Sequence, residues 1–166
     1  FKLAGRWDEE SKRLKAFLSN ELGEHNALMA MADYDPEKKT IEASATLNGM
    51  SPKIALPFVS GIFSDLGGNM SGRLSAKGSL DSLSLASRDL RLEALTITPA
   101  FTGVTYTLNG AVDINDTGIR LDGVEVADSS TGKGTLNGTL KHNHLKDMAL
   151  DASLRFRQME LLNLKE

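Results

Sequence analysis

The sequence predicts a mainly β protein, an antiparallel ladder of hairpins with one short amphipathic helix, and three observations support this. Apolar residues alternate with other residues in segment after segment, as at Tyr106, Leu108, Gly110, Val112 and Ile114. Because strand side chains point to alternate faces, a period of two predicts a sheet with one apolar face. Gly, Asn, Asp and Pro interrupt the alternation at short intervals, as they do in hairpin turns. A stretch near residues 57–66 has an apolar period of four instead.

Residues 1–50 are predicted to form the first hairpins. Residues 1–7 have the composition of a strand, whereas residues 8–23 fit either a helix or a strand, and the surrounding hairpins favour the strand. Residues 26–34 and 41–47 alternate on either side of the turn Asp35-Pro36-Glu37-Lys38. Asn48-Gly49 is expected to end the second of these strands, since Asn-Gly is typical of strand ends.

Residues 51–68 are predicted to contain the helix. Pro57 suits a first helical turn, and Gly67-Gly68 is a typical helix stop. Gly61 costs ~1 kcal/mol of helix propensity, so the helix would depend on packing its apolar stripe against the sheet. The residues expected to cap the apolar face of the sheet in this way are Phe58, Ile62, Phe63 and Leu66.

Residues 69–166 are predicted to continue the hairpin ladder within the same single β-rich unit. The alternation changes parity between Leu92 and Leu95, which indicates a β-bulge. Thr-Leu-Asn-Gly occurs at 46–49, 107–110 and 135–138, and each copy is interpreted as strand material followed by a strand end. If the apolar face is open, the residues expected to line its groove are Met70, Leu74, Tyr106, Leu108, Val112, Ile114, Leu136, Leu140, Met148, Leu150, Leu154 and Phe156.

Composition narrows the range of functions. The 166 residues suit one domain, and the net charge of −3 argues against a nucleic-acid partner. Aromatic residues make up 5% of the chain, so the apolar face must be mostly aliphatic. There is no cysteine, no signal peptide and no run of about 20 apolar residues that could span a membrane. Both ends look like strands, so we expect a piece of a longer protein whose sheet edges, at residues 1–7 and 161–166, self-associate.

No stretch carries a convincing catalytic or metal-binding motif. Residues 131–135 resemble a phosphate loop but lack its first glycine, and residues 113–118 resemble a calcium loop but lack its later ligands, so both are interpreted as turns. His142 and His144 are the one plausible metal pair, but no third ligand is evident. We therefore expect neither an enzyme nor a bound cofactor.

Residues 68–80, Gly-Asn-Met-Ser-Gly-Arg-Leu-Ser-Ala-Lys-Gly-Ser-Leu, resemble the Gly-x-x-Ser/Thr-Gly-x-Leu-x-x-x-Gly-Thr-Leu strand of the TamB family. TamB proteins are bacterial translocation and assembly module proteins related to the AsmA-like group. The preceding Leu56-Pro57-Phe58 matches the start of the short helix that is common in that family. Downstream, residues 104–110, 118–121, 132–140 and 142–147 follow the family's usual order. The resemblance covers roughly residues 51–166 well and the first 50 loosely.

The resemblance implies a sheet rolled into an open half-pipe, called a β-taco, with a hydrophobic groove. It also implies a periplasmic segment of a protein that an N-terminal helix, outside this chain, anchors in the inner membrane of a Gram-negative envelope. The expected role is outer-membrane biogenesis with an outer-membrane barrel partner, with phospholipid acyl chains or outer-membrane protein strands in the groove.

Two alternatives belong to other functional classes. The same apolar residues could fill a closed β-sandwich that serves as a binding or adhesion module. A polysaccharide-active enzyme on a β scaffold is less favoured, because Asp and Glu lie mostly at predicted turns.

Overall fold

The described residues form one ten-stranded antiparallel sheet in which every strand pairs with the next one in sequence. The computed structural model describes residues 1–22, 25–79, 81–143 and 146–157. The strands are β1 (Lys2–Asp8), β2 (Arg13–Leu22), β3 (His25–Asp35), β4 (Thr40–Met50), β5 (Phe63–Ser79), β6 (Ser82–Pro99), β7 (Tyr106–Asn115), β8 (Gly118–Asp128), β9 (Lys133–Asn143) and β10 (Lys146–Arg157). Residues 8–22 therefore belong to a hairpin and not to a helix, as the neighbouring strands indicated, and Gly23 lies outside the described residues.

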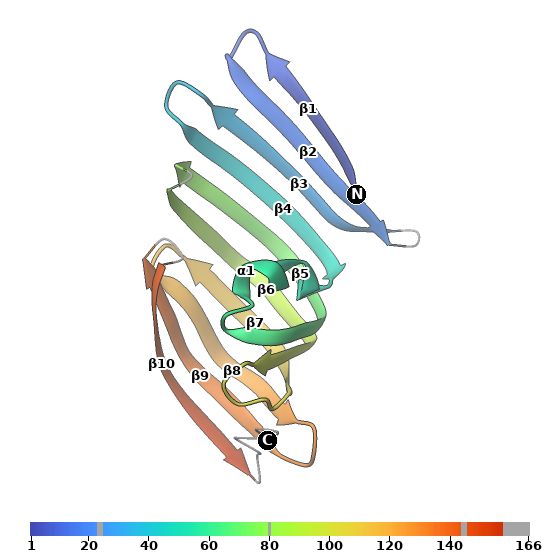
Figure 1. The fold of residues 1–166 in the computed structure, drawn as a ribbon, viewed down its shortest axis with the longest axis vertical. Coiled ribbons are helices and arrows are strands. Elements are labelled where there is room, and N and C mark those ends of the chain that lie inside the picture. The colour runs from blue at the N-terminus through green and yellow to red at the C-terminus, as the bar shows by residue number, and fades with distance from the viewer. Residues whose placement is uncertain (23–24, 80, 144–145, 158–166) are drawn as a thin grey trace.

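The sheet is open. Among the described residues β1 pairs only with β2 and β10 only with β9, so the ends do not meet to close a barrel. Figure 1 shows the sheet twisting and curling along its length, with β1 at one end and β10 at the other. The predicted mainly β half-pipe is confirmed. The alternative, a closed β-sandwich, is wrong, because the described strands form one sheet without a second sheet against it.

The β1–β2, β3–β4, β7–β8 and β8–β9 turns share one hydrogen-bonding device. In each of them the last residue of the first strand is Asp or Asn, and its side chain accepts backbone N–H groups of the turn that follows. Asp35 Oδ1 accepts from the amides of Glu37 and Lys38, at 3.1 and 3.0 Å. Asn115 Oδ1 accepts from Gly118 N at 3.1 Å, and Asp8 and Asp128 act in the same way. The calcium-like and phosphate-like segments are thus the β7–β8 and β8–β9 turns, as predicted.

Three β-bulges follow a second common rule. Each bulged residue has a positive φ, at Gly49 (64°), Ala94 (48°) and Gly123 (65°). In each case the amide of that residue donates to a side chain of the next strand: Gly49 to Ser71 (3.0 Å), Ala94 to Asn109 (2.7 Å) and Gly123 to Asn137 (2.8 Å). A bulge shifts the register by one residue and bends the strand, so the side chains on either side of it return to the same face. The bulge predicted between Leu92 and Leu95 is one of these.

The Thr-Leu-Asn-Gly copies have a different role from the one predicted. Asn109-Gly110 and Asn137-Gly138 lie inside β7 and β9 and do not end them. Their Asn side chains instead accept the bulge amides of the preceding strands. The register between neighbouring strands brings each Asn side chain next to a bulge amide, so this role could not be predicted from the motif alone.

The helical segment is earlier and shorter than predicted. A 3-10 turn, η1 (Pro52–Ala55), leads into α1 (Leu56–Val59), and β5 begins at Phe63, so the prediction of a helix near 57–66 is wrong in its extent. The four-residue apolar spacing was misleading because Phe63 and Leu66 pair with Pro99 and Ile97 of the long strand β6. The predicted stop, Gly67-Gly68, lies inside β5, where a Cβ at Gly68 would overlap the carbonyl of Ala94.

Candidate functional site

The two faces of the sheet differ sharply in chemistry. One side of the sheet carries a cluster of buried apolar residues, and we call this side the inner face. The cluster consists of Ala27, Leu28, Leu47, Met50, Leu90, Leu92, Leu95, Leu108, Val112, Val124 and Val126. At its centre this face is fully packed, since Val124 is 0% and Leu108 6% exposed. The opposite side is the outer face. The candidate site is the inner face, because its apolar surface continues beyond the packed centre.

The helical segment and the β6–β7 connection lie together beside the sheet. In Figure 1, α1 crosses in front of the middle of the sheet, and both η1 and α1 contact β5. The amide of Ala100 donates to the carbonyl of Ile62 at 2.9 Å, which ties the end of this segment to the β6–β7 connection. Val104 in that connection is 2% exposed. The β4–β5 connection therefore contacts both β5 and the β6–β7 connection.

The inner face is open where it reaches β1 and β2. Pairing of Leu3 with Leu18 and of Trp7 with Leu14 places these residues on the same side as Leu28. Leu3 is 76%, Trp7 43% and Leu14 43% exposed. Between them runs a row of small residues in direct register, Gly5, Ala16, Ala32, Ala43 and Ala76. The apolar surface thus passes from a packed centre to an uncovered end.

The predicted groove residues occupy the inner face wherever their side chains are described. Leu108 and Val112 belong to the buried cluster, and Met70, Leu74, Tyr106, Ile114 and Leu136 pack against it, partly exposed. Leu140 is half-buried and pairs with Ile119. The side chains of Met148, Leu150, Leu154 and Phe156 lie outside the described part, although the backbone of β10 pairs Leu150 with Leu140 and Leu154 with Leu136.

The predicted cap is only partly assembled. Leu66 is buried at 6% exposure, Phe63 is half-buried and Ile62 is 45% exposed. The side chain of Phe58 lies outside the described residues. The cap predicted on one helix is thus split between the turn before β5 and β5 itself.

Sequence reasoning missed the open end of the face. Leu3, Trp7 and Leu14 were not singled out, because residues 1–23 show alternation only weakly. The signal that could have found them is the cross-strand register, in which Leu14 pairs with Tyr34 and Leu18 with Ala30.

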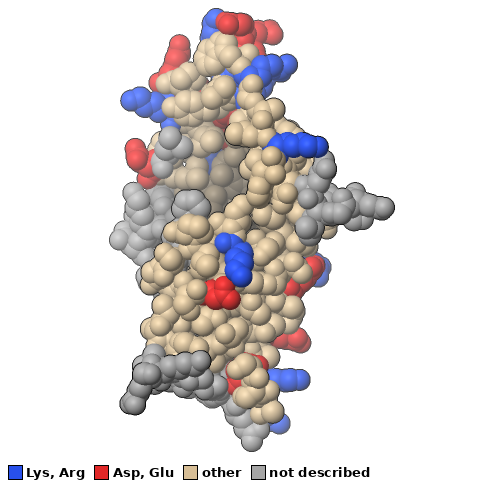
Figure 2. Space-filling model, turned by 45° about the vertical axis from the view of Figure 1, so that its right-hand side comes forward, with Lys and Arg blue, Asp and Glu red and all other residues tan. Residues whose placement is uncertain are grey.

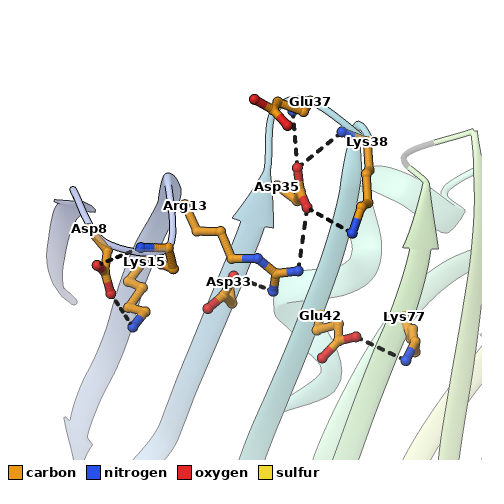
Figure 3. A network of polar contacts seen from close by, with 10 residues as sticks. Asp8, Arg13, Lys15, Asp33, Asp35, Glu37, Lys38, Glu42 and Lys77 are labelled. Atoms are coloured by element: carbon orange, nitrogen blue, oxygen red, sulfur yellow. Dashed lines mark hydrogen bonds and ion pairs between the residues drawn. The ribbon is translucent and has the colours of Figure 1, made fainter.

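The outer face of β1–β5 carries a ladder of ion pairs (Figure 3). Arg13 contacts Asp33 at 2.9 Å and Asp35 at 3.4 Å, Lys77 contacts Glu42 at 2.9 Å, and Lys15 contacts Asp8. The Lys15 ammonium lowers the pKa of Asp8 well below its usual range, and the Lys77 ammonium lowers the pKa of Glu42. The backbone amide of Lys38 lowers the pKa of Asp35. These carboxylates are charged at neutral pH, and the same face also carries the exposed apolar side chains of Phe17, Met29 and Met31.

Figure 2 views the molecule from a second direction. The surface seen there is mostly uncharged, with Lys, Arg, Asp and Glu toward its upper end and margins and one blue and red group near its centre, and its upper part is hollowed. This distribution agrees with the division into a charged and an apolar face.

The part of the chain that the structure describes has no group of three or more His, Cys, Asp or Glu side chains that could hold a metal ion. His144 and the side chain of His142, the predicted metal pair, lie outside that part. None of its helices has the length and apolar character needed to cross a membrane.

Neither a protein-family model, a curated protein nor a solved structure matches the chain. The functional argument therefore depends on the sheet and its faces alone.

Proposed function

We propose that the chain is a non-catalytic, TamB-like periplasmic segment that shelters apolar cargo on its inner face during outer-membrane biogenesis. The cargo would be phospholipid acyl chains or outer-membrane protein strands. In this proposal an anchor outside the chain holds the parent protein in the inner membrane, and an outer-membrane barrel is its partner.

One observation carries the proposal: the inner face is mostly apolar and packed at its centre, yet within the described residues it is exposed to solvent where it reaches β1 and β2. An exposed run that includes Leu3, Trp7 and Leu14 is unusual for a water-facing sheet, because burying one such side chain is worth about 1.5–3 kcal/mol. Contiguous exposed apolar surface typically marks a binding site. An apolar ligand laid along this end would recover that free energy.

The shape and chemistry of this end favour an extended aliphatic ligand. The row Gly5, Ala16, Ala32 and Ala43 is low in relief. Larger side chains lie on its two sides, where Leu14 pairs with Tyr34 and Leu3 pairs with Leu18. Transfer of an acyl chain from water gains about 0.8 kcal/mol per buried CH₂ group, without any directed polar contact. Such binding does not discriminate between headgroups, as expected of a conduit.

The test compares two exposed apolar residues of nearly equal exposure on opposite faces. Leu14 on the inner face is 43% exposed and Met29 on the outer face is 44% exposed. Native mass spectrometry of gently purified protein, with a fluorescent fatty-acid probe as a second readout, should detect bound lipid. We expect Leu14→Asp to reduce lipid and probe binding, because a carboxylate in the path of an acyl chain must be desolvated. Met29→Asp should leave both unchanged.

The outcome that contradicts the proposal is equally specific. The proposed groove would be refuted if the wild-type protein carried no lipid and did not bind the probe. It would also be refuted if the two variants lost lipid binding equally while remaining equally stable. Displacement of the probe by a synthetic peptide of alternating apolar and polar residues would identify outer-membrane protein strands as a second cargo.

A further inference from the structure

The outer face of β7–β10 contains a hollow of about 610 Å³ that has no part in the apolar site. Its polar lining includes Thr107, Glu125, Lys133, Thr135, Arg155 and Arg157. These positions alternate with inner-face residues such as Val124, Val126 and Leu136, so the hollow opens on the opposite side of the sheet. We call it the basic hollow.

The basic hollow concentrates positive charge in an acidic chain. Lys133, Arg155 and Arg157 against Glu125 leave a net charge of +2 in the lining, whereas the whole chain carries −3. Lys133 and Arg157 are direct cross-strand partners, and Arg155 is the partner of Thr135 on the same face. Like charges directly opposite one another on a sheet are destabilising.

Elsewhere on the outer face, like-charged neighbours have counter-ions. Arg6 and Lys15 are partners, but Lys15 is bonded to Asp8. Asp33 and Glu42 are partners, but Arg13 and Lys77 neutralise them. Within the described ranges no ion pair joins Lys133, Arg155 or Arg157 to a carboxylate. Glu125 offsets one of the three positive charges of the basic hollow, and the remaining repulsion has no described counter-ion.

We propose that the basic hollow binds a phosphate monoester. Arg155 and Arg157 supply planar guanidinium groups that can each give two parallel hydrogen bonds to phosphate oxygens, and Lys133 adds a compact charge. The hydroxyl groups of Thr107 and Thr135 are further donors. A dianion matches the net charge of +2. Glu125, which only accepts hydrogen bonds, suits a hydroxyl group next to the phosphate, as in glycerol phosphate or a sugar phosphate.

The test uses the whole chain and two probes. Glycerol 3-phosphate is titrated while backbone amide NMR shifts are followed, and vesicles of phosphatidylcholine with or without phosphatidic acid are tested by flotation. We expect shifts concentrated at the residues of the basic hollow. Binding of the soluble ester alone identifies a free metabolite as the source of the phosphate, and flotation only with phosphatidic acid identifies a lipid headgroup.

Two double variants with equal charge loss separate a site from a general ionic effect. Arg155→Gln with Arg157→Gln should raise the dissociation constant at least about tenfold, since hydrogen bonds to charged groups are among the strongest. Arg6→Gln with Arg91→Gln removes two exposed arginines outside the basic hollow and should change the dissociation constant by less than about twofold.

The proposal would be overturned if the NMR shifts were not localised and the vesicles did not float the protein. It would also be overturned if both double variants weakened phosphate binding equally. Because the two faces are separate, either result leaves the proposed lipid groove standing, and loss of lipid on the inner face would leave the basic hollow intact.

Discussion

Replacement of Asn109 by alanine tests whether side chains hold the bulges that curve the sheet. The side-chain oxygen of Asn109 accepts the amide of Ala94 at 2.7 Å, and Ala94 has a φ of 48°. A left-handed non-glycine residue costs roughly 1–2 kcal/mol, so the bulge needs a compensating contact. Loss of one neutral hydrogen bond typically costs about 0.5–1.5 kcal/mol. We therefore expect Asn109→Ala to lower the free energy of unfolding by about 1 kcal/mol.

The chain contains a matched control. Asn48 occupies the same place in Thr-Leu-Asn-Gly, but the adjacent bulge amide, that of Gly49, is bonded to Ser71. Asn48→Ala should change stability by less than about 0.5 kcal/mol, as at an ordinary surface site. Urea denaturation followed by circular dichroism measures both, and amide hydrogen exchange at Ala94 should accelerate only in Asn109→Ala. Equal losses in the two variants, or unchanged exchange at Ala94, would refute the reasoning.

Two further predictions concern backbone approach and pH. Gly72→Ala should lower the free energy of unfolding, measured in urea, by more than about 1 kcal/mol, because φ is +138° and a Cβ would lie 2.6 Å from the Asp89 carbonyl oxygen. Gly61→Ala is the control and should leave stability unchanged, since a Cβ there would have no atom within 4 Å. Similar losses in the two variants would contradict this reasoning. The outer-face carboxyl groups with lowered pKa values are Asp8, Asp35, Glu42 and Asp89. Their stabilisation is present above the unfolded pKa and lost as pH falls through the folded one, so the urea midpoint should drop below about pH 4. A midpoint unchanged there at low salt would argue against the ion pairs.

Much of the fold could be predicted from local pattern. Alternation gave the strand faces of β3, β4, β7 and β8, and Asp35 and Asn115 marked turns in the way their side chains are used. The parity change between Leu92 and Leu95 located a bulge. These features depend on residues close in sequence, so one sequence contains enough information to find them.

The remaining features depend on register between strands. Leu66 has helical spacing from Phe58, yet pairing with Ile97 determines its conformation. Asn109 becomes a bulge acceptor only because β7 is aligned with Ala94. The basic hollow likewise needs Lys133 opposite Arg157. Propensity is overridden wherever tertiary pairing supplies more hydrogen bonds than the local alternative.

The strictly sequential strand order has a consequence for size. Each strand has only its predecessor and successor as partners, so the sheet behaves as a linear array whose stability is a sum of neighbour terms. Adding or deleting one hairpin would change the length of the array by roughly 10 Å, two strand spacings, without disturbing pairs elsewhere. Insertion or deletion of single hairpins is therefore a route by which evolution can change the length of such a protein.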